Sequence, residues 1–328
     1  MRAFITGITG MDGSHLAEFL LGKGYEVAGL VRRNSNESFW RLDHIKEELH
    51  LINGDLTSGE SLIRAIEICN PDEIYNLGAQ SFVKYSFDDP IATCNATAMG
   101  ALRLIEAVRQ VCPEARVYQA SSSEQFGKVL ETPQKETTPF YPRSPYGVSK
   151  VFAHYIMKNY REAYGMPISC GICFNHESER RGIEFVSRKI TDGVAKIRLG
   201  QQKKIKLGNL EAKRDFGYAP DYVRGMWMML QSEPDDYVMA TGVTKSIREF
   251  FEETIKQANL PGTLEDYYEQ DERFMRPAEV DYLCGDATKI REKLGWEPKT
   301  TFPEMVKKMV DADYNRNLPI TINFGFKK

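Results

Sequence analysis

The sequence predicts an α/β protein with a Rossmann-type, doubly wound parallel sheet and a smaller C-terminal lobe. Short apolar segments alternate with helical patterns through the first half of the 328 residues. A glycine-rich turn, "TGITGMDG", lies between the first apolar segment and the first helical pattern. Strands that alternate with helices favour a parallel sheet with helices on both faces.

The elements follow one another in a regular order. "AFITG" predicts the first strand, a helix is expected at about 12–23, and "EVAGLV" predicts the second strand. The third strand falls in "LHLINGDL", a helix follows near 59–69, and "DEIYNLGA" gives the fourth strand. A long helix at about 91–111 precedes the strand "ARVYQASSS". Ligands bind beyond the carboxyl ends of such strands, which is where the motifs below fall.

The regular alternation of predicted strands and helices becomes less clear in the second half of the chain. A helix at about 145–164 and a strand ending at Cys173 complete the regular part, and turn residues and charges multiply beyond residue 176. We therefore expect residues 1–176 to form mainly the nucleotide-binding domain. Residues 177–328 are expected to form mainly a substrate lobe that returns some elements to the sheet.

Composition excludes several classes of protein. A net charge of −3 and a pI near 6.1 argue against a broad nucleic-acid surface. No apolar stretch approaches the roughly 18 residues of a membrane span, and no signal peptide is evident. Six scattered cysteines favour reduced thiols in the cytoplasm, and Cys170 and Cys173 are interpreted as buried strand residues. Five scattered histidines offer no metal site.

The glycine motif predicts a dinucleotide site. Gly7, Gly10 and Gly13 are three residues apart between a strand and a helix. This spacing lets backbone amides approach a pyrophosphate at the helix N-terminus, where the helix dipole favours anions. Asp12 within the motif is also a candidate cofactor residue.

The end of the second strand favours NADP over NAD. An NAD enzyme usually carries an acid here, whereas this chain has Arg32 and Arg33, which suit a 2′-phosphate. A pair of solvated arginines is the alternative. Asp55, with Leu56 beside it, follows the third strand and could accept a hydrogen bond from adenine. An Asx turn at Asp55 is nearly as good an explanation.

Tyr146 and Lys150 in "YGVSK" predict alcohol oxidation. They are four residues apart and share one helix face. A free tyrosine, with a pKa near about 10, is a poor base at neutral pH. An adjacent ammonium, together with an oxidised nicotinamide, would favour the phenolate.

The stretch "SSSEQFG" adds a carboxylate that a plain dehydrogenase does not need. Ser122 can hydrogen-bond the alcohol being oxidised, and Glu124 follows two residues later. Oxidation acidifies the hydrogen on the carbon next to the new ketone, so a carboxylate there can remove that proton and return it to a departing hydroxyl. Glu124 therefore predicts a dehydratase that regenerates its own cofactor. A surface glutamate in a loop is the alternative.

These residues carry a family resemblance. The chain resembles the extended short-chain dehydrogenase/reductases and, within them, the GDP-mannose 4,6-dehydratase family. The resemblance runs through "TGITGMDGSHLAEFLL", "TPFYPRSPYGVSK", "FNHESERRGIEFVSRKIT", "KRDFGYAPDYV" and "RPAEVDYLCGD", over nearly the full length. "FNHESERRG" and "RPAEV" are narrower than the general signature of the superfamily.

The resemblance implies a catalytic set and a substrate. Ser122, Glu124, Tyr146 and Lys150 match the family's catalytic positions, with Ser122 where the family usually has threonine. Contacts to a GDP-sugar would fall on Asn175, Arg181, Lys189, Arg214, Arg276 and Glu279. The implied reaction converts GDP-D-mannose to GDP-4-keto-6-deoxy-D-mannose with NADP. The arginine loop after the second strand implies a homotetramer built as a dimer of dimers.

Three alternatives stay open. The same dehydration could act on a related sugar nucleotide such as GDP-manno-heptose. A 4-epimerase or a 4-keto reductase could use the same scaffold, but neither needs Glu124. A catalytically silent NADP-sensing module is the non-enzyme alternative. His176, in "FNHES", is interpreted as a structural histidine.

Overall fold

A seven-stranded sheet forms the centre of the computed structural model, which describes residues 1–32, 39–274, 280 and 282–319. The strand order is β11-β6-β5-β4-β1-β2-β3, and all neighbouring pairs are parallel. The strands are β1 (Arg2–Thr6), β2 (Glu26–Val31), β3 (Leu49–Asn53), β4 (Glu73–Asn76), β5 (Arg116–Ser122), β6 (Ile168–Cys173) and β11 (Asp236–Met239). The chain winds outward in both directions from β1, so the switch point lies between β1 and β4 and the predicted doubly wound fold is confirmed.

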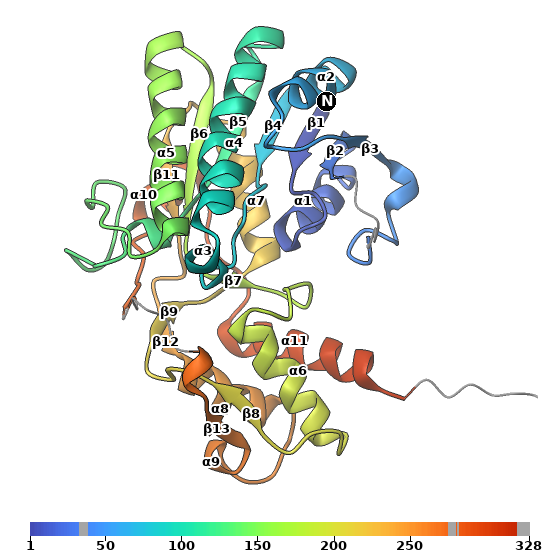
Figure 1. Ribbon diagram of the computed structural model, residues 1–328, viewed down its shortest axis with the longest axis vertical. Coiled ribbons are helices and arrows are strands. Elements are labelled where there is room, and N and C mark those ends of the chain that lie inside the picture. Colours follow the sequence, from blue (N-terminus) through green and yellow to red (C-terminus); the bar gives the residue numbers. More distant parts are fainter. Residues whose placement is uncertain (33–38, 275–279, 281, 320–328) are drawn as a thin grey trace, which may run out of the picture.

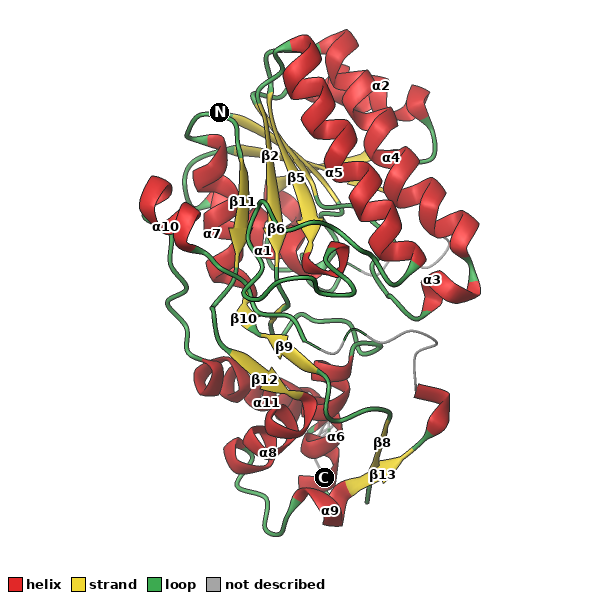
Figure 2. Cartoon of the chain, turned by 90° about the vertical axis from the view of Figure 1, so that its left-hand side faces the viewer, coloured by secondary structure: helices red, strands yellow, loops and turns green. Residues whose placement is uncertain are grey.

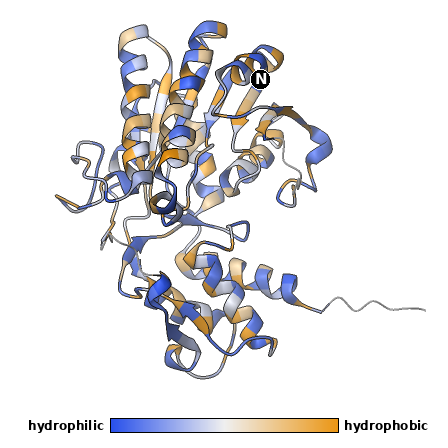
Figure 3. Cartoon of the chain, in the orientation of Figure 1, coloured by the Kyte–Doolittle hydropathy of each residue, from blue (hydrophilic) through white to orange (hydrophobic). Residues whose placement is uncertain are grey.

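Helices cover both faces of the sheet (Figure 2). One face is covered by α2 (Gly59–Cys69), α4 (Pro90–Val111) and α5 (Pro145–Tyr164), and the other by α1 (Met11–Leu21) and α7 (Ala219–Leu230). These helices carry hydrophobic and hydrophilic residues side by side (Figure 3), as expected of helices with one face on a sheet and one in water. The short helix α3 (Tyr85–Asp88) precedes α4, and α10 (Thr288–Leu294) lies beside β11.

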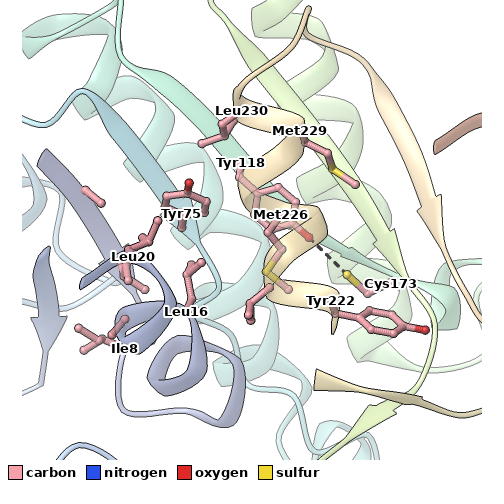
Figure 4. Packing of buried hydrophobic residues seen from close by; sticks show 14 of the residues in the cluster. Ile8, Leu16, Leu20, Tyr75, Tyr118, Cys173, Tyr222, Met226, Met229 and Leu230 are labelled. Atoms are coloured by element: carbon pink, nitrogen blue, oxygen red, sulfur yellow. Dashed lines mark hydrogen bonds between the residues drawn. The ribbon is translucent and has the colours of Figure 1, made fainter. Parts of the chain in front are cut away.

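The core under α1 and α7 is rich in aromatic and sulfur-containing side chains (Figure 4). Tyr75 and Tyr118 project from β4 and β5 toward Met226 of α7, and all three side chains are fully buried. The Tyr118 hydroxyl lies 3.3 Å from the Cys173 sulfur. All six cysteines are free thiols, and Cys170 and Cys173 pack inside β6 as the sequence predicted.

A second, smaller group of elements lies below the carboxyl ends of the strands (Figure 1). Its helices are α6 (Val186–Arg198), α8 (Ile247–Gln257), α9 (Leu264–Tyr267) and α11 (Phe302–Asn317). Its strand pairs are β10 (Gly217–Tyr218) with β7 (His176–Glu177), β12 (Thr244–Ser246) with β9 (Lys213–Asp215), and β13 (Tyr268–Gln270) with β8 (Ile205–Leu207). It has its own hydrophobic core, centred on Phe250, Phe251 and Met309.

The second half of the chain also returns to the sheet. Helix α7 and strand β11 both come after the first elements of the lower group, yet they pack in the upper layer. Three single 3-10 turns complete the described elements: η1 (Lys46–Glu48), η2 (Ser123–Gln125) and η3 (Glu272–Phe274). Within the described residues, no helix has both the length and the apolar character that a bilayer crossing requires.

Candidate active site

A large cavity of about 1160 Å³ lies between the carboxyl ends of the sheet strands and the lower group of elements. Residues from the ends of β1, β2, β4, β5 and β6 line one side of it, and residues from α6, β8 and β9 line the other. Ligand sites of α/β sheets are expected at this place. The cavity brings together all but three of the predicted site residues, namely Arg33, Arg276 and Glu279, which lie outside the described residues.

The glycine turn leads directly into helix α1 at one end of the cavity. Gly7 has a φ of +72°, which favours glycine. A Cβ on Gly13 would lie 2.2 Å from the Gly7 carbonyl oxygen, so no side chain fits there without movement. Gly10 is the N-cap residue of α1 and provides no side-chain cap. The N-terminal turn of α1 therefore meets the cavity as bare backbone, which suits a pyrophosphate.

Unpartnered polar atoms face the same cavity. Asp12 Oδ1, Gln80 Oε1 and Asn175 Oδ1 are buried without a hydrogen-bond partner, and all three residues line the cavity. A buried acceptor without a donor is costly unless a ligand or water supplies one. The residues present thus fit a large polar ligand such as a dinucleotide.

The ends of β2 and β3 lie near the same end of the cavity. Arg32 is exposed and lines the cavity. Asp55 and Leu56 also line the cavity. The Asp55 carboxylate accepts hydrogen bonds from the Thr57 amide and hydroxyl, at 2.8 and 2.7 Å, so the Asx turn considered as an alternative is present. The turn leaves Asp55 in the cavity wall, so the two interpretations are compatible.

Tyr146 and Lys150 project from the first turns of α5. Ser144 caps this helix by accepting a hydrogen bond from the Gly147 amide at 3.0 Å, and Pro145 occupies the first helical turn. The Lys150 ammonium donates to the Ala120 carbonyl of β5 at 2.7 Å and lies 5.8 Å from the Tyr146 ring centroid. The helix is thus anchored to the strand that carries Ser122.

Burial controls the titration of both groups. It raises the pKa of the Tyr146 phenol, and a hydrogen bond with Ser122 offsets only part of this rise. Burial also lowers the pKa of Lys150 to about 8. The chain's own residues shift the phenol pKa upward because desolvation of the phenolate outweighs the nearby charges, whereas the phenolate predicted from the sequence also depends on the charge of an oxidised nicotinamide.

Ser122 and Glu124 lie at the end of β5, opposite Tyr146. Ser122 is the N-cap of η2, and its hydroxyl oxygen accepts a hydrogen bond from the Glu124 amide at 3.2 Å. Glu124 is 7% exposed, lines the cavity and raises the pKa of Tyr146 through its charge. The hydroxyl, the carboxylate and the phenol therefore meet in one place, where they could act on adjacent atoms of one substrate.

The predicted substrate residues that the structure describes line the cavity from both sides, and Lys189 and Arg214 belong to the lower group of elements. Asn175 follows β6, and Arg181 lies 3.1 Å from Glu177 and over the Phe185 ring. Lys189 of α6 points at the Phe274 ring, with 3.1 Å between its ammonium and the ring centroid. Arg214 of β9 is buried and donates to the Val280 carbonyl at 2.6 Å.

Sequence reasoning missed several side chains of the cavity. Gln80, Phe82 and Phe185 line it, and Phe82 and Phe185 pack edge to face at 5.7 Å. Gln80 and Phe82 follow β4, so their position after a strand end was an available signal. Phe185 carried no comparable signal, because it immediately precedes a helix of the lower group.

The fold and the cavity define the class of protein. A parallel Rossmann sheet with a glycine turn, a serine at a strand end and a Tyr-x-x-x-Lys helix is the arrangement of the extended short-chain dehydrogenase/reductases. The crystal structure of UDP-glucose 4-epimerase from Thermus thermophilus in complex with NAD superposes with a TM-score of 0.85, at 26% identity, over 97% of this chain and 100% of that one.

Sequence comparison gives the family. The model of the family "GDP-mannose 4,6 dehydratase" matches residues 4–309. GDP-mannose 4,6 dehydratase 2 of Arabidopsis thaliana is 52% identical, covering 95% of this chain and 86% of that protein. The human GDP-mannose 4,6 dehydratase is 50% identical, covering 95% of this chain and 91% of that protein. The chain belongs to the GDP-mannose 4,6-dehydratase family, which confirms the resemblance drawn from its motifs.

Proposed function

We propose that this protein is a GDP-mannose 4,6-dehydratase, which converts GDP-D-mannose to GDP-4-keto-6-deoxy-D-mannose and water. The observation that carries the proposal is Glu124, a carboxylate in the cavity wall two residues after Ser122 and beside Tyr146. Membership of the family supports the same activity over nearly the whole chain.

The cofactor in this proposal is a nicotinamide dinucleotide, and NADP in particular. Gly7, Gly10, Gly13 and the backbone amide of Asp12 would hold the pyrophosphate end, Asp55 and Leu56 the adenine end, and Tyr146 and Lys150 the nicotinamide ribose. Arg32, at the end of β2, supports the choice of NADP, since a guanidinium suits the 2′-phosphate. Arg33 is proposed to share this role. A bound nicotinamide would supply the hydride acceptor for oxidation at C4 and the hydride donor for reduction at C6, and its oxidised form would add positive charge to the cavity.

Tyr146 and Ser122 act on the 4-hydroxyl. The Ser122 hydroxyl holds O4, and Tyr146 removes the O4 proton as C4 is oxidised. Lys150 keeps its ammonium on the Ala120 carbonyl, one helical turn from Tyr146, and favours the phenolate when the phenol loses its proton. Burial raises the pKa of the Tyr146 phenol, and the positive charge of an oxidised nicotinamide would act against this rise and favour the phenolate.

Glu124 acts on C5 and C6. The new C4 ketone acidifies the C5 hydrogen, and Glu124 takes that proton as a general base. The same carboxyl group then donates its proton to the C6 hydroxyl, the C6–O bond breaks and water leaves. Hydride addition at C6 is followed by protonation at C5 with the proton that Tyr146 took from O4, or with a solvent proton exchanged for it, so Tyr146, Glu124 and the cofactor all end in the state in which they began.

The remaining predicted residues bind the nucleotide part of the substrate. We propose cationic contacts to the diphosphate from Arg181, Lys189, Arg214 and Arg276. Asn175 and Glu279 are proposed to hydrogen-bond the sugar or the base. We also propose that residues 1–176 and 177–328 divide these duties between cofactor and substrate, although elements of the second part return to the sheet.

The same proposal includes self-association into a homotetramer, a dimer of dimers. Val148, Phe152 and Tyr155 are exposed at helical spacing on α5, and Ile91 and Met99 are exposed on the adjacent α4. Exposed apolar side chains on two helices that pack together support an interface with a second copy. A cytoplasmic location is also proposed, and six free thiols support a reducing compartment.

Incubation with GDP-mannose and catalytic NADP in deuterated water tests the activity. We expect a 4-keto-6-deoxy product with one deuterium at C5, detected by mass spectrometry, and no net loss of cofactor. An unchanged sugar here, together with consumption of one NADPH per turnover when a 4-keto sugar nucleotide and NADPH are supplied, would contradict the proposal and favour a 4-keto reductase, and a C4 epimer would favour an epimerase. Faster turnover of GDP-manno-heptose under the same conditions would move the proposal to that substrate.

A further inference from the structure

We propose that Gln125 is a positioning residue that fixes the catalytic strand end against the catalytic helix. The inference rests on the proposed function, because it assigns Gln125 to the alignment of Ser122, Tyr146 and Lys150 for that reaction. Gln125 itself does not line the cavity, whereas its neighbours Ser123 and Glu124 do. Its side chain is 0% exposed.

Both ends of the Gln125 carboxamide bind the backbone of a catalytic residue. Its Oε1 accepts a hydrogen bond from the Ser122 amide at 3.1 Å. Its Nε2 donates to the Lys150 carbonyl at 2.8 Å. One planar group therefore holds the end of β5 and the first half of α5 at a fixed separation.

This bridge does more than close the η2 turn. A side chain at this position of a capping box needs only to accept from the N-cap amide, which here is that of Ser122. The second bond, to Lys150, crosses to a different element 25 residues away. The Lys150 ammonium separately donates to the Ala120 carbonyl. Both the backbone and the side chain of Lys150 are therefore hydrogen-bonded to the end of β5 or to the η2 turn that follows it.

Close packing makes the bridge sensitive to change. A Cβ on Gly147, next to Tyr146, would lie 2.8 Å from the Glu124 carbonyl oxygen, so α5 and η2 are already in contact here. Removing the bridge leaves the Ser122 amide without this acceptor and lets the strand end and the helix shift relative to each other. A displacement of about 1 Å between reacting groups is enough to cost up to about 100-fold in rate.

Gln125→Leu tests the bridge, and Gln134→Leu is its matched control. Gln134 is also 0% exposed, accepts from a backbone amide, that of Cys284, at 2.9 Å, and donates to a backbone carbonyl, that of Glu131, at 2.9 Å. Gln134 does not line the cavity.

We expect Gln125→Leu to lower kcat about 10- to 100-fold, with KM within about twofold of the parent's. The variant should also bind NADP more weakly, as measured by calorimetry. Gln134→Leu should lose similar thermal stability while kcat and NADP affinity stay within about twofold of the parent.

Gln125→Glu gives a readout that a purely structural role would not move. A protonated glutamic acid can accept from the Ser122 amide and donate to the Lys150 carbonyl, as the amide does. The ionised form has no donor and places a negative charge against that carbonyl. The ratio of kcat in Gln125→Glu to kcat in the parent should therefore rise as pH falls from 9 to 6, whereas the ratio for Gln125→Leu should stay constant.

The outcomes separate the two proposals. If the parent does not dehydrate GDP-mannose, the proposed function fails. The role of Gln125 can then still be tested, by comparing how the NADP affinity of Gln125→Glu and that of the parent change with pH. If Gln125→Leu does not fold, Gln125→Glu decides alone. A pH-independent ratio for Gln125→Glu, or equal losses of activity and NADP affinity in Gln125→Leu and Gln134→Leu, would overturn the inference.

Discussion

Asp12 Oδ2 and His176 Nε2 lie 3.0 Å apart, joining the first turn of α1 to strand β7. The other ring nitrogen of His176 faces the Phe174 carbonyl at 2.7 Å, and a carbonyl can only accept, so Nδ1 carries a proton. The pKa of His176 is shifted upward and that of Asp12 downward, and both shifts favour an imidazolium paired with a carboxylate. The ring also stacks on Tyr222, with 4.4 Å between the centroids. His176 is thus a structural residue of the cavity wall.

This pair predicts a pH-dependent stability. Burial alone would lower the pKa of His176, but Asp12 outweighs it and the net shift is upward. Burial alone would raise the pKa of Asp12, but His176 outweighs it and the net shift is downward. The stabilisation is therefore complete between the unfolded values of about 4 for aspartate and 6.5 for histidine. It is lost as pH rises through the folded pKa of His176, and as pH falls through that of Asp12.

His176→Gln measures the contribution of the pair. Urea unfolding at pH 5.5 should show a loss of about 1–3 kcal/mol relative to the parent, because the variant leaves a partly buried carboxylate without its cation. The difference should shrink in alkaline buffer, where the parent also loses the imidazolium. His50→Gln, at an exposed position on β3, is the control and should leave the unfolding free energy unchanged. A difference that grows with pH would contradict the charge assignment.

Lys150 predicts a conflict between stability and activity. Its pKa is lowered to about 8 by burial, so charging it costs about 3 kcal/mol in the folded protein. Lys150→Met removes that cost but leaves the Ala120 carbonyl without its donor, at about 1 kcal/mol. We expect the variant to be about 2 kcal/mol more stable at pH 7 and inactive.

The sign of this effect can be checked with pH. Between the folded pKa of about 8 and the unfolded value of about 10.4, the unfolded chain binds more protons, so the stability of the parent rises with pH. The advantage of Lys150→Met should therefore disappear in urea titrations near pH 10. An advantage that is constant from pH 7 to pH 10 would show that it comes from packing and not from charge.

Local signals predicted most of the regular fold. The limits of α5 follow from Ser144 and Pro145 at its start and Gly165, with a φ of +66°, at its end. Positions within a few residues of a motif, such as Ser122, Glu124, Tyr146 and Lys150, could be placed because strand ends converge at one edge of a parallel sheet. The strand order was harder, since nothing local brings β11 beside β6.

Contacts between distant segments escaped prediction. Asp12 and His176 are separated by 164 residues, and the proton on His176 Nδ1 is fixed by a carbonyl that no sequence pattern marks. The sequence places Lys150 one helical turn from Tyr146, but it does not reveal the burial that raises the pKa of the Tyr146 phenol, because burial depends on the whole fold. The sequence spacing of two residues on one helix shows whether a charge lies nearby, whereas the loss of solvent around a side chain cannot be inferred from that spacing.

Gly13→Ala should abolish tight cofactor binding. A Cβ at Gly13 meets the Gly7 carbonyl oxygen at 2.2 Å, so the turn must open and the start of α1 must move. We expect NADP affinity to fall about 10- to 100-fold, measured by calorimetry. Gly59→Ala is the control, because Gly59 also begins a helix and a Cβ there meets nothing within 4 Å. Equal affinities in the two variants would exclude the glycine turn from the cofactor site.

Arg32→Glu tests the choice between NADP and NAD. If Arg32 binds the 2′-phosphate, the substitution replaces a charge-assisted hydrogen bond by repulsion. Because Arg32 is exposed, we expect a change of about tenfold in the ratio of the two dissociation constants, in favour of NAD. The affinity for NAD serves as the internal control for general damage. An unchanged ratio would assign the 2′-phosphate to other residues.

Glu124→Gln separates oxidation from elimination. The amide keeps the shape of the side chain but cannot take the C5 proton, so water loss should fall at least about 100-fold. Oxidation at C4 depends on Tyr146 and Ser122 and should remain detectable as cofactor absorbance at 340 nm in a single turnover. Glu114→Gln, exposed just before the amino end of β5, should match the parent in both steps.

If Glu124→Gln still releases the 6-deoxy product at the parent's rate, another group must remove the C5 proton, and the proposed role of Glu124 is wrong. If oxidation and elimination disappear together while NADP still binds, Glu124 acts at C4 as well, and the division of labour between the carboxylate and the phenol has to be redrawn.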